Sequence, residues 1–143
     1  MSLNILVVDD SAVMRSMIIR TLKLAGLPLG DIHQAGNGQE GLAVLEKEWV
    51  DLALVDINMP VMNGEEMIDR TRQNPSTADL PILVVSTESS TARIDGLRKK
   101  GVEFIHKPFT PEGLRQKIVG LTGVTTNGRP GGQDALSDSG CDF

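Results

Sequence analysis

Hydrophobic positions along the first 121 residues follow two alternating periods. Short apolar runs typical of β-strands alternate five times with stretches in which apolar residues recur at helical spacing. The expected strands are Ile5 to Val8, Asp31 to Ala35, Leu52 to Val55, Ile82 to Val85 and Glu103 to Ile105. The first, third and fourth are continuously apolar, as in parallel strands that helices cover on both faces. The pattern predicts a doubly wound, three-layer α/β domain of five βα units.

Five amphipathic helices are expected between and after these strands. The residues that mark them are Met14, Met17, Ile18, Leu22 and Ala25; Leu42, Leu45 and Trp49; Met67, Ile68 and Thr71; Ala92, Ile94 and Leu97; and Leu114, Ile118 and Leu121. Gly26 and Gly101 are placed to end the first and fourth helices, because glycine readily adopts the conformation of a helix C-terminus. Thr110 is expected to cap the fifth helix, with Pro111 at its first helical position.

The helical pattern ends at Leu121, where the composition also changes. Residues 122–143 are rich in glycine and polar residues and contain few apolar ones. Such a segment buries too little surface to offset the entropy lost on ordering. The sequence therefore predicts one domain over residues 1–121 and a flexible tail over residues 122–143, too short to be an output domain.

Charge and cysteine content narrow the possible partners. The net charge is −5 and no basic stripe offsets it, which disfavours a nucleic-acid or anionic-membrane partner. The single cysteine, Cys141, cannot form an internal disulfide. No signal peptide and no apolar stretch of membrane-spanning length is visible. We therefore expect a soluble, cytoplasmic protein that does not insert into a membrane.

Acidic residues follow two of the apolar strands. Asp9 and Asp10 follow the first strand, and Asp56 follows the third. In doubly wound sheets the ligand site lies beyond the carboxyl ends of the strands, where the winding reverses. Three carboxylates there repel one another unless a cation intervenes, and Mg²⁺ prefers oxygen ligands. The spacing predicts a magnesium site that presents one carboxylate to a phosphoryl donor. Capping of the next helix is the competing explanation for Asp10 alone.

A lysine and a hydroxyl follow the last two strands. Lys107 can pair with Asp56 or with a phosphoryl oxygen. Pro108 allows a cis peptide bond that would aim this lysine inward, although cis is the minority state of X-Pro bonds. Ser86 is the expected hydroxyl donor at the end of the fourth strand. Thr87 is its rival, since side-chain alternation lets one of the two point at Asp56.

Several short motifs now stand in a fixed order along the chain. They are Val7-Val8-Asp9-Asp10, then Val55-Asp56-Ile57-Asn58-Met59-Pro60 with Gly64, then Ser86-Thr87, and then Lys107-Pro108-Phe109. Each is weak alone, but their combined order and spacing resemble the receiver domain of two-component response regulators. The resemblance extends from about Asn4 to Leu121. It implies a stand-alone CheY-like domain, which is a flavodoxin-like (βα)5 parallel sheet with strand order 2-1-3-4-5.

The resemblance also implies roles for the residues at the strand ends. Asp56 would accept a phosphoryl group from a sensor histidine kinase or a histidine phosphotransferase. The other roles that it implies are Mg²⁺ binding by Asp9, Asp10, Asp56 and the backbone carbonyl of Asn58, and contact with the phosphoryl group by Ser86 and Lys107.

Signal output and signal lifetime have their own candidate residues. Phe104 matches an aromatic switch position: its ring would turn inward as Ser86 moves, which would remodel the face made by the fourth helix, fifth strand and fifth helix. Ordinary core packing is the alternative for Phe104. Asn58 and Glu88 flank the expected path of the hydrolytic water and resemble the pair found in fast-clearing chemotaxis regulators. The candidate contacts for a downstream protein are Arg93, Arg98, Lys99 and His106.

Two other classes of protein compete with a signalling module. An aspartyl-phosphate phosphatase needs a second aspartate two residues after the nucleophile, to protonate the leaving group. Asn58 stands there and cannot do so. A flavodoxin-like nucleotide-binding protein needs a phosphate-cradling loop after the first strand, where Asp9 and Asp10 would instead repel phosphate. The sequence therefore favours a non-enzymatic receiver of chemotaxis type, with a phosphorelay intermediate as the second choice.

Overall fold

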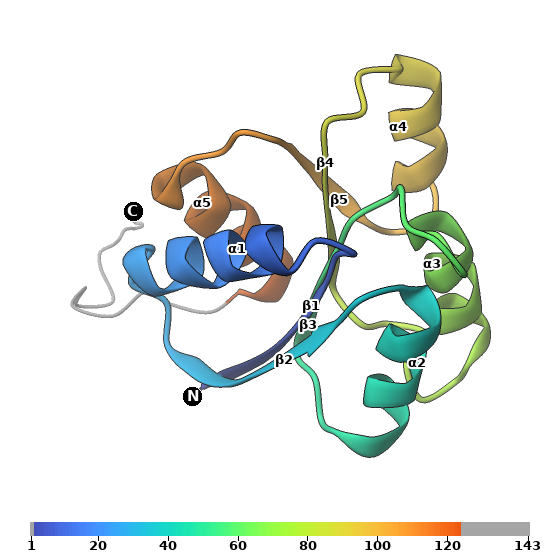
Figure 1. Cartoon of the computed structure of the whole chain (residues 1–143), viewed down its shortest axis with the longest axis horizontal. Helices are drawn as coiled ribbons and strands as arrows, with labels where there is room; N and C mark the ends of the chain where they lie inside the picture. The colour runs from blue at the N-terminus through green and yellow to red at the C-terminus, as the bar shows by residue number, and fades with distance from the viewer. Residues whose placement is uncertain (1, 124–143) are drawn as a thin grey trace.

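The computed structural model describes residues 2–123, in which strands and helices alternate (Figure 1). The ten elements are β1 (Leu3–Val8), α1 (Ala12–Leu24), β2 (Leu29–Ala35), α2 (Gly38–Lys47), β3 (Leu52–Val55), α3 (Gly64–Gln73), β4 (Ile82–Ser86), α4 (Thr91–Arg98), β5 (Glu103–His106) and α5 (Pro111–Thr122). The predicted alternation of five strands and five helices is confirmed.

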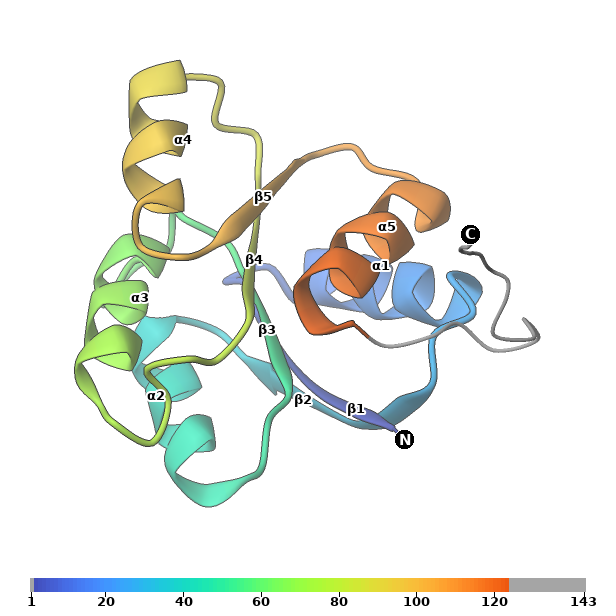
Figure 2. The ribbon, with the colours of Figure 1, turned by 180° about the vertical axis from the view of Figure 1, so that it is seen from behind.

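All five strands are parallel and form one sheet in the order β2-β1-β3-β4-β5. Helices α1 and α5 cover one face, and α2, α3 and α4 cover the other (Figures 1 and 2). The chain winds outward from β1 to β2 and then returns to β3, so the switch point lies between β1 and β3. Val8 pairs with Val55 at the carboxyl ends of these two strands. The residues that follow them therefore emerge side by side.

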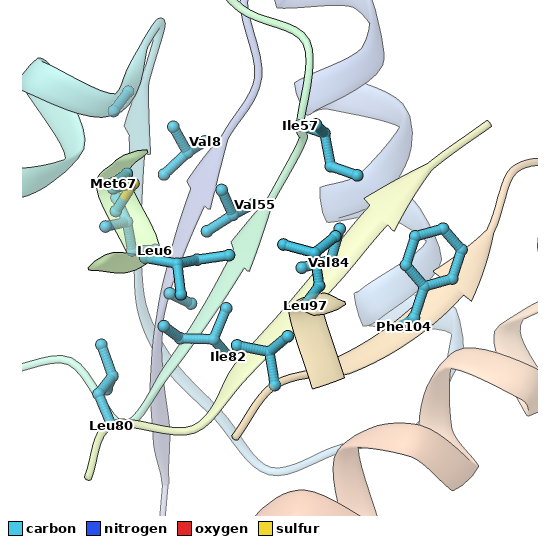
Figure 3. Packing of buried hydrophobic residues seen from close by; sticks show 14 of the residues in the cluster. Leu6, Val8, Val55, Ile57, Met67, Leu80, Ile82, Val84, Leu97 and Phe104 are labelled. Carbon is cyan, nitrogen blue, oxygen red and sulfur yellow. The ribbon is translucent and has the colours of Figure 1, made fainter. Parts of the chain in front are cut away.

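Each face of the sheet has its own hydrophobic core. Leu6 and Val8 of β1 belong to the core beneath α2, α3 and α4, together with Val84 and Phe104 (Figure 3). The alternate residues of β1, such as Val7, belong to the core beneath α1 and α5. Successive side chains of a strand point to opposite faces. A strand covered on both faces therefore has to be apolar throughout, which explains the continuous runs in the sequence.

The helix boundaries confirm most of the predicted signals. Gly26 and Gly101 adopt positive φ values of 75° and 77° at the ends of α1 and α4. The Thr110 side chain accepts a hydrogen bond from the Gly113 amide and caps α5. Helix α5 continues to Thr122, one residue beyond the predicted domain boundary. Beyond Gly123 the predicted tail lies outside the described residues.

Three of the apolar residues that marked the predicted helices are exposed. Trp49 lies outside α2, which ends at Lys47, because Glu48 takes an extended conformation. The indole is 76% exposed, and its Nε1 donates a hydrogen bond to Asp51 Oδ1 over 2.8 Å. Met17 on α1 is 56% exposed, and Ala92 on α4 is also exposed. The prediction that Trp49 belongs to the second helix is therefore wrong, and an apolar side chain at helical spacing need not face the core.

Within residues 2–123, none of the helices is long and apolar enough to span a bilayer.

Candidate functional site

Three carboxylates meet at the carboxyl edge of the sheet. Asp9 and Asp10 follow β1, Asp56 follows β3, and one oxygen of each lies within 4.8 Å of the others. The Asp56 amide donates a hydrogen bond to the Val8 carbonyl over 2.9 Å, which extends the β1–β3 pairing into the site. The side chains of Asp9 and Asp56 are 3% and 12% exposed, whereas Asp10 is exposed. The structure thus brings together the acids that the sequence predicted.

Capping does not explain the position of Asp10. The N-cap of α1 is Ser11, whose hydroxyl accepts a hydrogen bond from the Met14 amide. Asp9 Oδ1 accepts from the Ser11 amide over 2.9 Å, and this bond orients the Asp9 carboxylate. Asp10 lies before the cap with its carboxylate in the acidic cluster.

Lys107 brings an ammonium group into the cluster from the end of β5. Its Nζ lies 3.2 Å from Asp9 Oδ2 and 3.8 Å from Asp56 Oδ1. The expected pairing with Asp56 is therefore present, but the contact with Asp9 is shorter. The Lys107–Pro108 peptide bond is cis. Asp9 and Asp56 share this ammonium and Asp10 adds a third carboxylate, so the cluster retains an excess of negative charge.

The surroundings of Asp56 raise the pKa of its carboxyl group. Burial of the carboxyl group is the largest influence and raises the pKa above its ordinary value, and the charges of Asp9 and Asp10 raise it further. Lys107 and the Ile57 amide act in the opposite direction without cancelling the rise. Ionised Asp56 is thus held at a cost that a nearby cation would relieve.

The donor set fits a hard divalent cation such as Mg²⁺. Asp9, Asp10 and Asp56 supply carboxylate oxygens within 4.8 Å of one another. The exposure of Asp10 leaves room for the water ligands that Mg²⁺ retains. Asn58 is exposed in the loop that follows β3, and the role of its carbonyl as a further ligand stays a prediction.

Gly64 makes the close packing of α3 on the site possible. A Cβ atom at this position would lie 2.1 Å from the Asp56 carbonyl oxygen. The Gly64 amide also donates a hydrogen bond to the Ile57 carbonyl over 2.9 Å. A residue with a side chain would therefore displace the backbone that carries Asp56. The sequence motif includes Gly64, but this steric reason for a glycine is visible only in the structure.

Arg15 of α1 is a neighbour of the site that the sequence did not single out. Its Nη1 donates a 2.5 Å hydrogen bond to the Asp9 carbonyl, and its Nε donates to Gln34 Oε1 over 3.0 Å. The guanidinium thereby ties α1 to the ends of β1 and β2. No local sequence signal distinguishes it from an ordinary surface arginine.

Ser86 and Thr87 are separated by burial. Ser86 at the end of β4 is 1% exposed, and Thr87 is exposed. The Lys107 amide donates to the Ser86 carbonyl over 2.9 Å and pairs the ends of β4 and β5. Ser86 Oγ accepts a hydrogen bond from the Glu88 amide over 3.2 Å. Of the two hydroxyls, Ser86 is the one directed into the fold.

The ring of Phe104 already lies inside. It is 3% exposed and belongs to the same core as Val84 and Leu97 (Figure 3). The His106 ring meets it edge to face, with centroids 4.8 Å apart and an interplanar angle of 69°. Core packing thus describes Phe104 in this structure, and a change of its rotamer stays a prediction.

The carboxylate of Glu88 is engaged within the loop between β4 and α4. Its Oε2 accepts from the Ser90 amide over 3.0 Å, and its Oε1 pairs with Arg93 Nη1 at 3.2 Å. The side chain is 18% exposed. Glu88 therefore has partners of its own, which the sequence did not reveal.

Comparisons with known proteins agree with this geometry. The family model described as response regulator receiver domain matches residues 5–119. A chemotaxis protein CheY homolog of Campylobacter jejuni is 39% identical over 124 residues, covering 85% of this chain and 94% of its own. CheY1 of Helicobacter pylori is 35% identical, with 85% and 98% covered. PhoB of Pseudomonas aeruginosa, a transcriptional regulatory protein, is 32% identical, and 58% of its length is matched.

Solved structures give the same result. CheY4 of Vibrio cholerae has a TM-score of 0.75 at 33% identity, covering 85% of this chain and 99% of its own. A putative response regulator of Chloroflexus aurantiacus has a TM-score of 0.77 at 26% identity, with 86% and 99% covered. From the strand order, the acidic cluster and these matches together, we conclude that the chain belongs to the response regulator receiver family.

Proposed function

We propose that Asp56 accepts a phosphoryl group from a phosphohistidine of a partner protein, in a reaction that requires Mg²⁺. The observation that carries this proposal is the acidic cluster itself. Three carboxylates lie within 4.8 Å of one another, with Lys107 Nζ in reach of two of them. Crowded carboxylates, two of them mostly buried, disfavour folding unless a cation binds, so their presence supports a functional role for the cluster.

In the proposed reaction a carboxylate oxygen of Asp56 attacks phosphorus, the phosphorus–nitrogen bond breaks, and the imidazole leaves. Lys107 is placed to compensate charge on the phosphoryl oxygens, since its Nζ is 3.8 Å from Asp56 Oδ1. The Ser86 hydroxyl would donate a hydrogen bond to one of those oxygens. Bound Mg²⁺, held by Asp9, Asp10 and Asp56, would supply charge neutralisation and orientation.

We infer that phosphorylated Asp56 serves as a signal and not as an intermediate in the turnover of phosphoesters. Receiver domains belong to a signalling family, and Asn58 offers no acidic proton for a leaving group. We therefore infer that external phosphoesters are not substrates. Hydrolysis of the phosphoryl group on Asp56 itself would end the signal. We propose that Asn58 influences the rate of this step, and exchange of Asn58 for a bulky apolar residue should change the decay rate.

The output surface that we propose lies on α4, β5 and α5. A hollow of about 360 Å³ on this face is lined by residues of all three elements, including Ile94, Phe104 and Lys117. Occupation of Asp56 would alter this face by shifting the population of two arrangements. Relatives named as chemotaxis proteins favour a chemotaxis-type role. The match to PhoB shows that receivers in other pathways are also similar, and a phosphorelay intermediate is the second candidate.

Labelling with a small phosphodonor tests the central proposal. We expect acetyl phosphate to label the wild-type protein in the presence of Mg²⁺ and not after chelation by EDTA. The Asp56→Asn variant should stay unlabelled. Label in that variant at the wild-type level would contradict the assignment of Asp56, and label without Mg²⁺ would contradict the requirement for the ion.

A further inference from the structure

The two ends of α4 are joined to the rest of the molecule by different contacts. At the C-terminal end, Arg72 of α3 donates hydrogen bonds to the carbonyl oxygens of Lys100 and Gly101, over 2.9 Å and 3.1 Å. Lys100 Nζ also pairs with Asp69 of α3 at 2.5 Å. These contacts involve main-chain carbonyls as well as a side chain, so they anchor this end of α4 firmly to α3.

The N-terminal end of α4 is joined through Arg93. Its Nη1 lies 3.2 Å from Glu88 Oε1 in the loop between β4 and α4, and its Nη2 lies 3.7 Å from Glu65 Oε1 on α3. One guanidinium therefore ties the helix, the preceding loop and the neighbouring helix together. This end of α4 stands away from the sheet and is joined to β4 by residues 87–90 (Figures 1 and 2).

Arg93 holds the loop that begins directly after Ser86. The Glu88 amide donates a hydrogen bond to Ser86 Oγ over 3.2 Å, and the Glu88 carboxylate pairs with Arg93. Displacement of Ser86 toward a phosphoryl group on Asp56 would draw the start of this loop with it. The contacts made by Arg93 oppose such a displacement, because Glu88 can follow Ser86 only by leaving Arg93 or moving α4.

We propose that Arg93 is a positioning residue that latches the loop between β4 and α4 in the unphosphorylated arrangement. The inference rests on the proposed function of Asp56 and adds its regulation. Release of the latch accompanies binding of a phosphoryl group, so the latch lowers the affinity of the site for that group. By linkage, a variant without the latch holds a phosphoryl mimic more tightly.

The expected size of the effect follows from exposure. The side chains of Arg93, Glu88 and Glu65 are 36%, 18% and 41% exposed. Partly exposed ion pairs contribute little individually, so removal of both should change affinity about threefold to tenfold. The sign of the change is diagnostic. Loss of a positive charge alone would weaken the binding of an anion, whereas loss of the latch strengthens it.

Beryllofluoride with Mg²⁺ is the probe, and its affinity for the full chain is measured by ¹⁹F NMR or calorimetry. Arg93→Gln should bind it about threefold to tenfold more tightly than the wild type. Arg93→Lys should fall between them, since one ammonium replaces a fork that serves two carboxylates. The matched control is Arg98→Gln. Arg98 lies on the same helix as Arg93, and this change removes its ion pair of the same length with Glu103 of β5. It should stay within about twofold of the wild type.

Two further measurements separate the latch from a general structural role. Amide hydrogen exchange over residues 87–91 should quicken in Arg93→Gln without a change in the exchange of the β-strands. Glu88→Gln combined with Arg93→Gln should be non-additive, because the two residues act through one contact. If the effects of the two substitutions on beryllofluoride affinity were additive in this double-mutant cycle, the latch would be refuted.

The outcomes distinguish the latch from the function on which it rests. A wild-type protein that does not bind beryllofluoride in the presence of Mg²⁺ would refute the proposed function, and the latch with it. If the wild type binds but Arg93→Gln binds equally or more weakly, the latch alone is refuted. An equal gain of beryllofluoride affinity in Arg98→Gln would also refute the latch, since loss of any positive charge on α4 would then explain the effect.

Discussion

Two aspartates flank the same strand and serve opposite purposes. Asp51 precedes β3 at the amino edge of the sheet, where its carboxylate accepts hydrogen bonds from the Asn4 amide and from Trp49 Nε1, both over 2.8 Å. Asp56 follows β3 at the carboxyl edge, among two other carboxylates and one shared lysine. The first is satisfied by neutral donors, whereas the second is mostly buried beside two other carboxylates and shares one ammonium with Asp9. This difference, more than residue type, separates a structural carboxylate from a candidate acceptor.

The largest expected difference between the two aspartates is in phosphoryl labelling. Asp56→Asn should lose all Mg²⁺-dependent labelling by acetyl phosphate, because the attacking oxygen is gone. Asp51→Asn, at the opposite end of the same strand, should be labelled at the wild-type rate. Quantitative autoradiography of both variants beside the wild type measures this. Equal loss in both would mean that labelling reports folding and not the acceptor.

The backbone at the carboxyl edge should be equally intolerant. Gly64→Ala would place a Cβ atom 2.1 Å from the Asp56 carbonyl oxygen, so we expect a loss of about 3 kcal/mol in the free energy of unfolding. Gly120 on α5 is the matched control, since a Cβ there meets nothing within 4 Å. Gly120→Ala should stabilise by about 0.5–1 kcal/mol. Urea unfolding followed by circular dichroism checks both values, and a neutral Gly64→Ala would contradict the packing.

Removal of the satisfied aspartate should cost stability. Asp51→Ala leaves the Asn4 amide and the Trp49 indole without their acceptor, so the free energy of unfolding should fall by about 2 kcal/mol. The same urea experiment measures it. Glu46→Ala, an exposed carboxylate on α2, serves as a control that should stay within about 0.5 kcal/mol of the wild type.

Removal of the repelled aspartate should have the opposite sign. With EDTA present, Asp56→Asn should raise the free energy of unfolding by about 1 kcal/mol at pH 7. The pKa of Asp56 is raised in the folded state above its ordinary value of 3.8, so the folded protein carries this charge less readily than the unfolded chain. The wild type therefore loses stability relative to Asp56→Asn as the pH rises above that value.

Two controls sharpen this last prediction. The advantage of Asp56→Asn should vanish near pH 3.8, where the wild-type carboxyl is increasingly protonated. It should also shrink when Mg²⁺ is added, because the ion stabilises the wild type by binding its folded state. An advantage that is independent of both pH and Mg²⁺ would argue against its expected cause, which is burial of the ionised carboxylate beside Asp9 and Asp10.

Much of the fold could be predicted because its signals are local. The continuous apolar run before Asp56 reflects burial on both faces of one strand, and the Thr110–Pro111 pair reflects one helix start. Neither depends on a distant partner. Trp49 was misplaced because its environment is set by the turn between α2 and β3 and by Asp51, not by helical spacing.

The sequence could predict which residues form the candidate site, but not which of them contact one another. The sequence by itself determined which residues emerge at the ends of parallel strands, since strand polarity and side-chain alternation are properties of each segment. Tertiary structure decided that Lys107 lies nearer to Asp9 than to Asp56 and that the Glu88 carboxylate pairs with Arg93. Those contacts depend on how α4 and the loop after β5 pack, and a difference of a few tenths of an ångström there selects the partner.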